Sequence, residues 1–249
     1  MSDIFSVLIL FAAGTIAGFV NVVAGGGSAL TLPALIFLGL PSSVANGTNR
    51  IGVLLQNVSA VYSFKREKYF ETSTSFKLGL STLPGSVAGA LIATELSNDL
   101  FNKILGIIMI GIIIIMILPK KKNKFPDAET NHIPLSGHIS MFFIGFYGGF
   151  IQVGIGFLLM AALQASLKIN LIRVNMHKVF IVLINTIPAF IVFILTDNIH
   201  WGYGFSLAAG NALGGWFSAK VQVKKGEDFI KTFLIIAIMI MAVKLLDIF

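Results

Sequence analysis

The feature that most constrains this chain is a series of apolar segments, most of them long enough to cross a membrane as a helix. An α-helix rises about 1.5 Å per residue, so about 20 apolar residues span a hydrocarbon layer of about 30 Å. Two shorter segments follow glycine-rich breaks and reach only part of that distance, so we interpret them as half-spanning elements. The long segments lie at about 4–24, 44–64, 77–94, 101–118, 137–154, 174–196, 201–219 and 229–248, and the short ones at about 28–40 and 156–168.

The balance of apolar and charged residues supports this interpretation. Of the 249 residues, 56% are hydrophobic and 12% are charged, whereas soluble domains carry about 25% charged residues. A soluble core in a chain of this length cannot bury so much apolar surface, so we predict an all-α integral membrane protein. Met1–Ile4 lacks the Lys or Arg of a cleaved signal peptide, so the first segment is expected to be retained. The absence of cysteine excludes disulfides, thiolate metal sites and a cysteine nucleophile.

The two halves of the chain resemble each other. Small residues spaced four apart recur in register in both halves, and glycines at this spacing let helix backbones approach closely in lipid. The alignment also pairs Asn21 with Gln152. Three stretches align in order: GTIAGFVN at 14–21 with GFYGGFIQ at 145–152, NGTNRIGVLLQNVSAVYSF at 46–64 with NMHKVFIVLINTIPAFIVF at 175–193, and GSVAGA at 85–90 with GNALGG at 210–215.

The charges of the connecting loops predict that these halves are inverted. Lys and Arg crowd the connection after 44–64, the central linker and the connection after 201–219, which places these connections in the cytoplasm. The connections at 95–100 and 197–200 carry acidic residues and no Lys or Arg, and are placed outside. The connection after 44–64 is therefore inside, and its counterpart after 174–196 is outside.

Inversion requires an odd number of segments in each half, and the five predicted segments per half satisfy this condition, so we predict two inverted structural repeats. Each would contain three full transmembrane helices plus a hairpin or re-entrant pair with a short half-helix, giving about 8–10 membrane segments in total. The first repeat is expected at 1–118, a cytoplasmic basic linker at 119–136 and the second repeat at 137–249, with both termini extracytoplasmic. This layout is typical of secondary transporters, whose site lies near the midplane. A helical bundle whose duplication has no transport meaning is the alternative.

Polar residues gather inside one of the predicted spans, in VANGTNRIGVLLQN at 44–57. At 100° per residue, Asn46, Asn49, Arg50, Gln56 and Asn57 share one helix face. A cation at the centre of a span costs about 2.5–3.5 kcal/mol, so it must face protein or a wet cavity. The alternatives are that the arginine snorkels towards the outer surface and that the amides only join helices.

The second half has a comparable face, with Asn175, Lys178 and Asn185. All eleven acidic residues lie in loops or at segment ends, so no carboxylate within the spans can neutralise Arg50 or Lys178. Cation transporters normally carry buried Asp or Glu, whereas a guanidinium suits oxyanions. We therefore predict that the substrate is an anion, although Lys178 could instead snorkel inwards.

A glycine-rich break precedes each short helix. In AGGGSALTLP at 24–33, three glycines permit a sharp break, and Ser28 is expected to be the N-cap of the helix that follows. The N-terminus of such a helix offers free N–H groups to an anion. VGIG at 153–156 occupies the corresponding place, and a packing break at a hairpin is the alternative for both.

These observations define a set of candidate substrate-binding residues. His177 is included because it could couple transport to protons, although a satisfied structural histidine is the favoured interpretation. No catalytic residue, metal site or cofactor is expected. The set consists of Asn21, Gly26, Gly27, Ser28, Asn46, Thr48, Asn49, Arg50, Asn57, Gln152, Asn175, His177 and Lys178.

The chain resembles the TauE/SafE family of membrane proteins, often called sulfite exporters. The resemblance lies in AGFVNVVAGGGSALTLP, ANGTNR and FIQVGIGFLLM, and it covers about residues 7–246. It implies a bacterial or archaeal inner-membrane permease for small sulfur-containing anions such as sulfite and organosulfonates. The chain departs from a Gly-Thr-Lys type sequence of many members, because it has Asn175-Met176-His177-Lys178. The lysine is kept, while the larger neighbours are expected to narrow the site or change the substrate.

Together these features predict a secondary transporter of small anions. The resemblance implies that these anions are sulfite or organosulfonates. A passive anion channel and a transporter of another anion, such as a carboxylate, are the alternatives. An enzyme is not expected, because the chain contains no HExxH, GxSxG, P-loop or GxGxxG pattern. The expected partners are the anion and membrane lipid, without nucleic acid, and a homodimer is left open.

Overall fold

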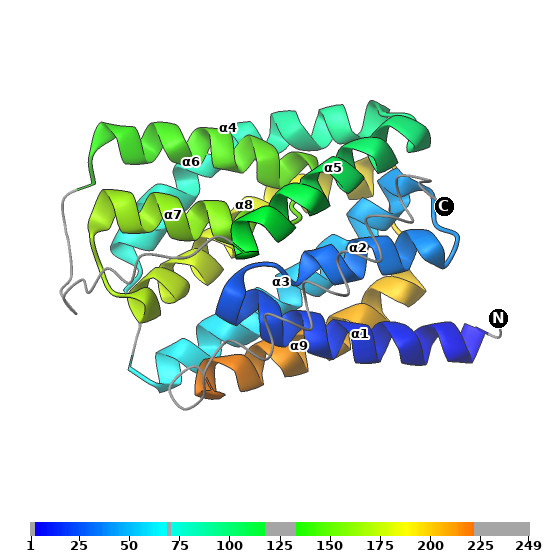
Figure 1. Ribbon diagram of the computed structural model, residues 1–249, viewed down its shortest axis with the longest axis horizontal. Coiled ribbons are helices and arrows are strands. Elements are labelled where there is room, and N and C mark those ends of the chain that lie inside the picture. The colour runs from blue at the N-terminus through cyan, green and yellow to red at the C-terminus, as the bar shows by residue number, and fades with distance from the viewer. Residues whose placement is uncertain (1–2, 69–70, 118–132, 222–249) are drawn as a thin grey trace.

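The computed structural model describes residues 3–68, 71–117 and 133–221, and within these ranges the regular structure is entirely α-helical (Figure 1). This agrees with the predicted all-α class. The predicted segment at 229–248, most of the linker at 119–136 and both extreme termini lie outside the described residues. The helices are α1 (Asp3–Ala24), α2 (Ser28–Phe37), α3 (Ser42–Arg66), α4 (Ser73–Glu95), α5 (Asn98–Ile117), α6 (Leu135–Phe150), α7 (Ile155–Leu167), α8 (Leu171–Leu195) and α9 (Trp201–Val221).

Helix lengths separate crossing helices from short ones. Four helices of the described chain are long and apolar enough to cross a membrane, in α1, α4, α5 and α8. Helix α3 has 25 residues, but its buried face is polar, which lowers its hydropathy. Helices α2 and α7, with 10 and 13 residues, reach only about 15–20 Å. Large apolar side chains face outwards on the long helices, and Leu195, Leu135 and Ile4 are each at least 74% exposed, as expected for a surface covered by lipid.

Local sequence signals set several helix boundaries. Pro41 and Pro134 immediately precede α3 and α6, where the fixed φ of proline and its missing N–H do not interrupt a helix. Asn170 caps α8, because its side-chain oxygen accepts a hydrogen bond of 2.9 Å from the backbone N–H of Arg173. The expected cap at Ser28 is wrong. Gly27 is the N-cap of α2 and already has helical φ and ψ, so Ser28 is the first helical residue and makes no capping bond.

Small residues hold the outer helix pairs together. Helix α1 packs on α9 and α6 packs on α4, and α3 and α8 lie between the two pairs (Figure 1). A Cβ added at any of the glycines concerned would come closer than 3.0 Å to the backbone of the facing helix. The predicted close approach through GxxxG spacing is therefore confirmed. These glycines are Gly14 and Gly18 of α1, Gly210 and Gly214 of α9, Gly85 and Gly89 of α4, and Gly145 and Gly149 of α6.

The helix contacts occur in matching pairs. If the aligned stretches are taken as equivalent, α1, α3 and α4 correspond to α6, α8 and α9. The contact of α1 with α9 then has its counterpart in the contact of α6 with α4, and the contact of α3 with α9 in that of α8 with α4. Helices α3 and α8 contact each other directly. The two halves of the chain are thus interleaved, because each outer pair takes one helix from each half.

The two glycine-rich breaks meet at the centre of the molecule. The backbone turns through positive φ at Gly25 (+86°) in the first break, and at Gln152 (+59°) and Gly154 (+74°) in the second. A Cβ at Gly25 would lie 2.7 Å from the Cα and carbonyl carbon of Gly156, and one at Gly156 would clash with the Cα of Gly25. Only glycine allows this backbone-to-backbone contact. The breaks therefore bring the starts of α2 and α7 together.

Candidate functional site

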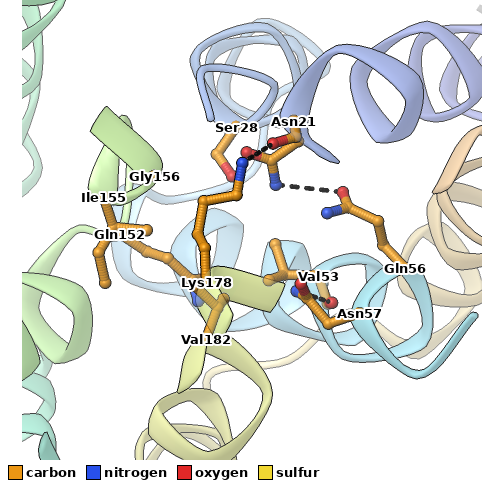
Figure 2. Close-up of a pocket in the computed structure, with 10 residues that line it drawn as sticks. All are labelled: Asn21, Ser28, Val53, Gln56, Asn57, Gln152, Ile155, Gly156, Lys178 and Val182. Atoms are coloured by element: carbon orange, nitrogen blue, oxygen red, sulfur yellow. Dashed lines mark hydrogen bonds between the residues drawn. The ribbon is translucent and has the colours of Figure 1, made fainter. Parts of the chain in front are cut away.

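A small cavity lies beside the two breaks, between the halves of the chain (Figure 2). Five helices and the second break contribute to its lining, so no single segment of the sequence could form it. The lining residues are Asn21, Ser28, Val53, Gln56, Asn57, Gln152, Ile155, Gly156, Lys178 and Val182.

Amide side chains make up much of the lining, and they are ordered by hydrogen bonds. Asn21 donates from Nδ2 to Oε1 of Gln56 at 3.2 Å, which joins α1 to α3 (Figure 2). Asn57 donates from Nδ2 to the carbonyl oxygen of Val53 at 2.7 Å, one turn earlier in α3. Such groups donate and accept, so the lining can form hydrogen bonds to a ligand with several oxygens.

Lys178 is the one charged residue among the described residues that line the cavity. Figure 2 shows its side chain extending from α8 across the cavity to end beside Asn21 and Ser28. The ammonium Nζ donates to the carbonyl oxygens of Val22 at 2.9 Å and Asn21 at 3.3 Å, and to Oδ1 of Asn175 at 2.7 Å. The two carbonyls belong to the last turn of α1, where helical carbonyls lack partners and a cation is stabilising.

Arg50 makes the corresponding contact in the other half. Its guanidinium donates through Nη1 to the carbonyl oxygen of Gly148 at 3.1 Å and through Nη2 to that of Gly149, both in the last turn of α6. Asn46 donates to the third carbonyl of this turn, that of Phe150, at 2.7 Å. The guanidinium carbon also lies 4.6 Å from the ring centroid of Phe193. Arg50 is 0% exposed and does not line the cavity.

Arg50 and Lys178 therefore occupy equivalent positions in the two halves of the chain. In each case a cation of the central helix, α3 or α8, binds the C-terminal carbonyls of the first helix of the other half. An asparagine four or three residues earlier, Asn46 or Asn175, offers its Oδ1 to the cation, at 3.5 Å from Arg50 and 2.7 Å from Lys178. The alignment makes the two asparagines equivalent. Both cations therefore have backbone carbonyl oxygens as partners, a kind of partner that does not depend on carboxylates within the spans.

The remaining predicted residues lie around this centre but outside the lining. Thr48 Oγ1 accepts the backbone N–H of His200 at 2.8 Å, and Asn49 Oδ1 accepts the hydroxyl of Thr31 at 2.6 Å. Gly26 and Gly27 form the first break, where Gly27 packs against the carbonyl oxygen of Ala17 so closely that a Cβ would clash. These residues shape the breaks and the ends of the central helices.

His177 has protein partners that include a carboxylate. Its Nδ1 lies 2.7 Å from the hydroxyl of Ser75, and its Nε2 lies 3.4 Å from Oε2 of Glu71. Oε1 of the same carboxylate accepts the N–H of Thr74 at 3.1 Å in the first turn of α4. The expectation of a satisfied structural histidine agrees with these contacts. Within the part of the chain that the structure describes, no three His, Cys, Asp or Glu side chains form a group that could hold a metal ion.

Five of the predicted residues thus meet in one cavity: Asn21, Ser28, Asn57, Gln152 and Lys178. Gln56 also lines the cavity, beside Asn21, although it is not among the predicted binding residues. It shares the polar helix face with Arg50 and Asn57, and this position is the sequence feature that indicates its place at the site. The apolar lining residues are Val53, Ile155 and Val182. Nothing in the sequence distinguishes them from other apolar residues, and they are identified only by their position at the cavity in the folded structure.

Comparison with known proteins gives one family. The family model described as "Sulfite exporter TauE/SafE" matches residues 10–245. No solved structure matches the chain. The chain is 29% identical over 238 residues to a "Probable membrane transporter protein" of Haemophilus influenzae, covering 95% of this chain and 93% of that protein.

Two further relatives have similar names. "Probable membrane transporter protein YfcA" of Escherichia coli is 29% identical over 240 residues, which cover 96% of this chain and 88% of the relative. "Probable membrane transporter protein YunE" of Bacillus subtilis is 24% identical over 244 residues, covering 88% of this chain and 89% of the relative. With a family model that spans nearly the whole sequence, the chain belongs to the sulfite exporter TauE/SafE family of membrane transporters.

Proposed function

We propose that this membrane transporter carries small anions, of the sulfite or organosulfonate type, across the bacterial inner membrane. The observation that carries the proposal is the position of Lys178, a cation in a cavity lined otherwise by amides, a hydroxyl and apolar groups. The described lining contains no carboxylate, which a cation site within a membrane normally needs. The description of the matching family supports sulfur oxyanions among the small anions.

The helix ends around the cavity favour negative charge. Helices α2 and α7 begin at Ser28 and Ile155, and both residues line the cavity, so the positive ends of two helix dipoles lie at its wall. The nearby C-terminal ends of α1 and α6 carry the opposite partial charge, but Lys178 and Arg50 bind their carbonyls. Lys178 and the two helix starts at the wall therefore favour an anion as ligand.

Lys178 can contact an anion by exchanging partners. An ammonium has three N–H donors, and the partners of Lys178 among the described residues include carbonyl and amide oxygens and the sulfur of Met160, which are weaker acceptors than a charged oxyanion. A bound anion would therefore draw Nζ from the end of α1, while Asn21, Asn57 and Ser28 offer further donors from the lining. Substrate contact by Asn46, Thr48, Asn49, Arg50, Asn175 and His177 stays a prediction, and it requires a conformation in which these side chains reach the cavity.

We further propose that the two halves are inverted repeats and that α2 and α7 are half-spanning helices of re-entrant pairs. The matching pairs of helix contacts and the meeting of the two breaks at Gly25 and Gly156 support this arrangement. In transporters of this kind the site lies where the repeats meet, and one unit rocks against the other around it. The cavity of this chain lies between residues of both halves, as such a mechanism needs.

Transport by purified protein in proteoliposomes tests the proposal. Labelled sulfite should accumulate by counterflow when unlabelled sulfite is enclosed, with a rate that saturates. Empty liposomes and a labelled alkali cation are the controls. Conductance without saturation or counterflow would identify a passive channel instead, and the absence of any protein-dependent anion flux would contradict the proposed substrate class.

A further inference from the structure

The second break places a glutamine side chain in an unusual position. Gln152 has a positive φ of 59°, which is uncommon outside glycine, and its side chain is among those that line the cavity. The residue is only 1% exposed. A positive φ at such a residue costs of order 1–3 kcal/mol and persists only where the surroundings hold it. The surroundings therefore hold this amide at the cavity.

The hydrogen bonds of Thr186 fix the orientation of the Gln152 amide. The Thr186 hydroxyl donates its single proton to the carbonyl oxygen of Val182 at 2.7 Å. The hydroxyl oxygen can then only accept from Gln152, which lies 2.7 Å away through Nε2. A turned-over amide would have to take the Thr186 proton, and the carbonyl oxygen of Val182 would lose its bond. With Nε2 of Gln152 facing Thr186 both hydrogen bonds form together, and Oε1 is the atom left for another partner.

Oε1 of Gln152 is buried and accepts no hydrogen bond from any described residue. A buried amide oxygen without a partner costs free energy, because it has lost its bonds to water. Gln152 thus brings an acceptor without a donor to a cavity that also holds the cation Lys178 and the starts of α2 and α7, which attract negative charge. A ligand that matches both features carries negative charge and a hydrogen-bond donor.

We propose that Gln152 makes the cavity selective for small monoanions that also carry an O–H or N–H group. Protonated oxyanions such as hydrogensulfite belong to this class, as do sulfonates with a hydroxyl or amino group. The anionic oxygens would bind Lys178, and the O–H or N–H group would donate to Oε1 of Gln152. This inference rests on the proposed transport of anions and adds a specificity residue to it. An anion without a donor would leave Oε1 unpaired and out of water.

Calorimetric titration of the purified protein in detergent can test this with a matched pair of anions. 2-Hydroxyethanesulfonate and ethanesulfonate are both fully ionised at neutral pH and differ in one hydroxyl group. The hydroxylated anion should bind about tenfold more tightly, which corresponds to one unpaired buried acceptor. Equal affinity, or tighter binding of ethanesulfonate, would overturn the role of Gln152 and leave anion binding intact. Failure of both anions to bind at any concentration tested would instead contradict the proposed function.

Two variants assign the difference to this side chain. Gln152→Leu and Gln152→Gly should reduce the tenfold preference to about one, and the glycine variant relieves the positive φ, which protects folding. Gln56→Leu is the matched control, because Oε1 of Gln56 already accepts from Asn21. This control should weaken both anions alike and keep the preference. A preference that persists in both Gln152 variants would overturn the proposal.

Discussion

The ammonium group of Lys178 donates a hydrogen bond of 2.9 Å to the carbonyl oxygen of Val22, a residue 156 positions away in the chain. Arg50 reaches Gly148 in the same manner in the opposite direction, at 3.1 Å. Each half of the chain therefore supplies the cation that completes the end of the other half's first helix. These paired contacts join α3 to the end of α6 and α8 to the end of α1, and only the lysine of the pair also lines the cavity.

Loss of Arg50 should destabilise the protein rather than merely change its substrate. Arg50→Gln leaves the buried carbonyls of Gly148 and Gly149 short of donors, and hydrogen bonds to a charged group are worth about 1.5–3 kcal/mol each. The midpoint of thermal unfolding in detergent should fall by several degrees, and Arg50→Lys should recover part of the loss. Lys103→Gln is the control, because the Lys103 side chain is 63% exposed and its ion pair with the exposed Asp99 is worth little, so the midpoint of this variant should not move.

The same variant tests the earlier expectation that Arg50 binds substrate. If Arg50→Gln is as stable as the wild type and yet loses transport, the guanidinium acts on the anion, and its bonds to α6 are incidental. Stability and transport that fall together support the structural role.

The contact between the two breaks should tolerate no side chain. Gly25→Ala and Gly156→Ala each place a Cβ closer than 3.0 Å to the backbone of the other break, and Gly25 also has a φ of +86°. Both variants should give little monodisperse protein on size-exclusion chromatography. Gly111→Ala is the matched control, because nothing lies within 4 Å of its Cβ, and alanine in a helix should be neutral or better by about 0.5–1 kcal/mol. Normal yields of both break variants would contradict the contact.

The proposed inversion predicts the sides on which two equivalent loops lie. Because the chain has no cysteine, single cysteines can be introduced without background. A membrane-impermeant maleimide on intact cells should label Thr196→Cys, after α8, and should reach Glu67→Cys, after α3, only when the membrane is opened. Both positions are exposed in the structure. Labelling of both cysteines in intact cells, or of neither, would contradict inverted halves.

Much of the fold follows from local sequence. Within the described residues, the ends of the apolar segments lie within four residues of the ends of the observed helices, because hydropathy is a property of each segment alone. The glycines at intervals of four predicted close packing, since only their backbone can approach another helix so nearly. The sequence alone did not show which helix each pair of glycines contacts. Gly14 and Gly18 pack on α9, and their aligned counterparts Gly145 and Gly149 pack on α4.

The site was predictable only in part, because its decisive contacts join distant residues. The absence of carboxylates in the spans suggested that Arg50 needs a substrate, but helix ends also offer carbonyl oxygens, and their location depends on the fold. The carboxylate of Glu71 reaches His177 for the same reason, although the two lie more than 100 positions apart in sequence. By contrast, the alignment of Asn21 with Gln152 correctly marked two residues that line the cavity.

The central claim is that the charge of Lys178 holds the transported anion between the two breaks. The most direct test is the initial rate of labelled sulfite counterflow into proteoliposomes that contain equal amounts of folded wild type, Lys178→Gln or Lys178→Arg. Lys77→Gln, which removes an exposed charge of the same kind, serves as the control. We expect Lys178→Gln to lower the saturable rate at least about tenfold, the equivalent of about 1.4 kcal/mol, while Lys178→Arg keeps part of the rate and Lys77→Gln has the wild-type rate. Sulfite uptake by Lys178→Gln with the wild-type rate and half-saturation would contradict it.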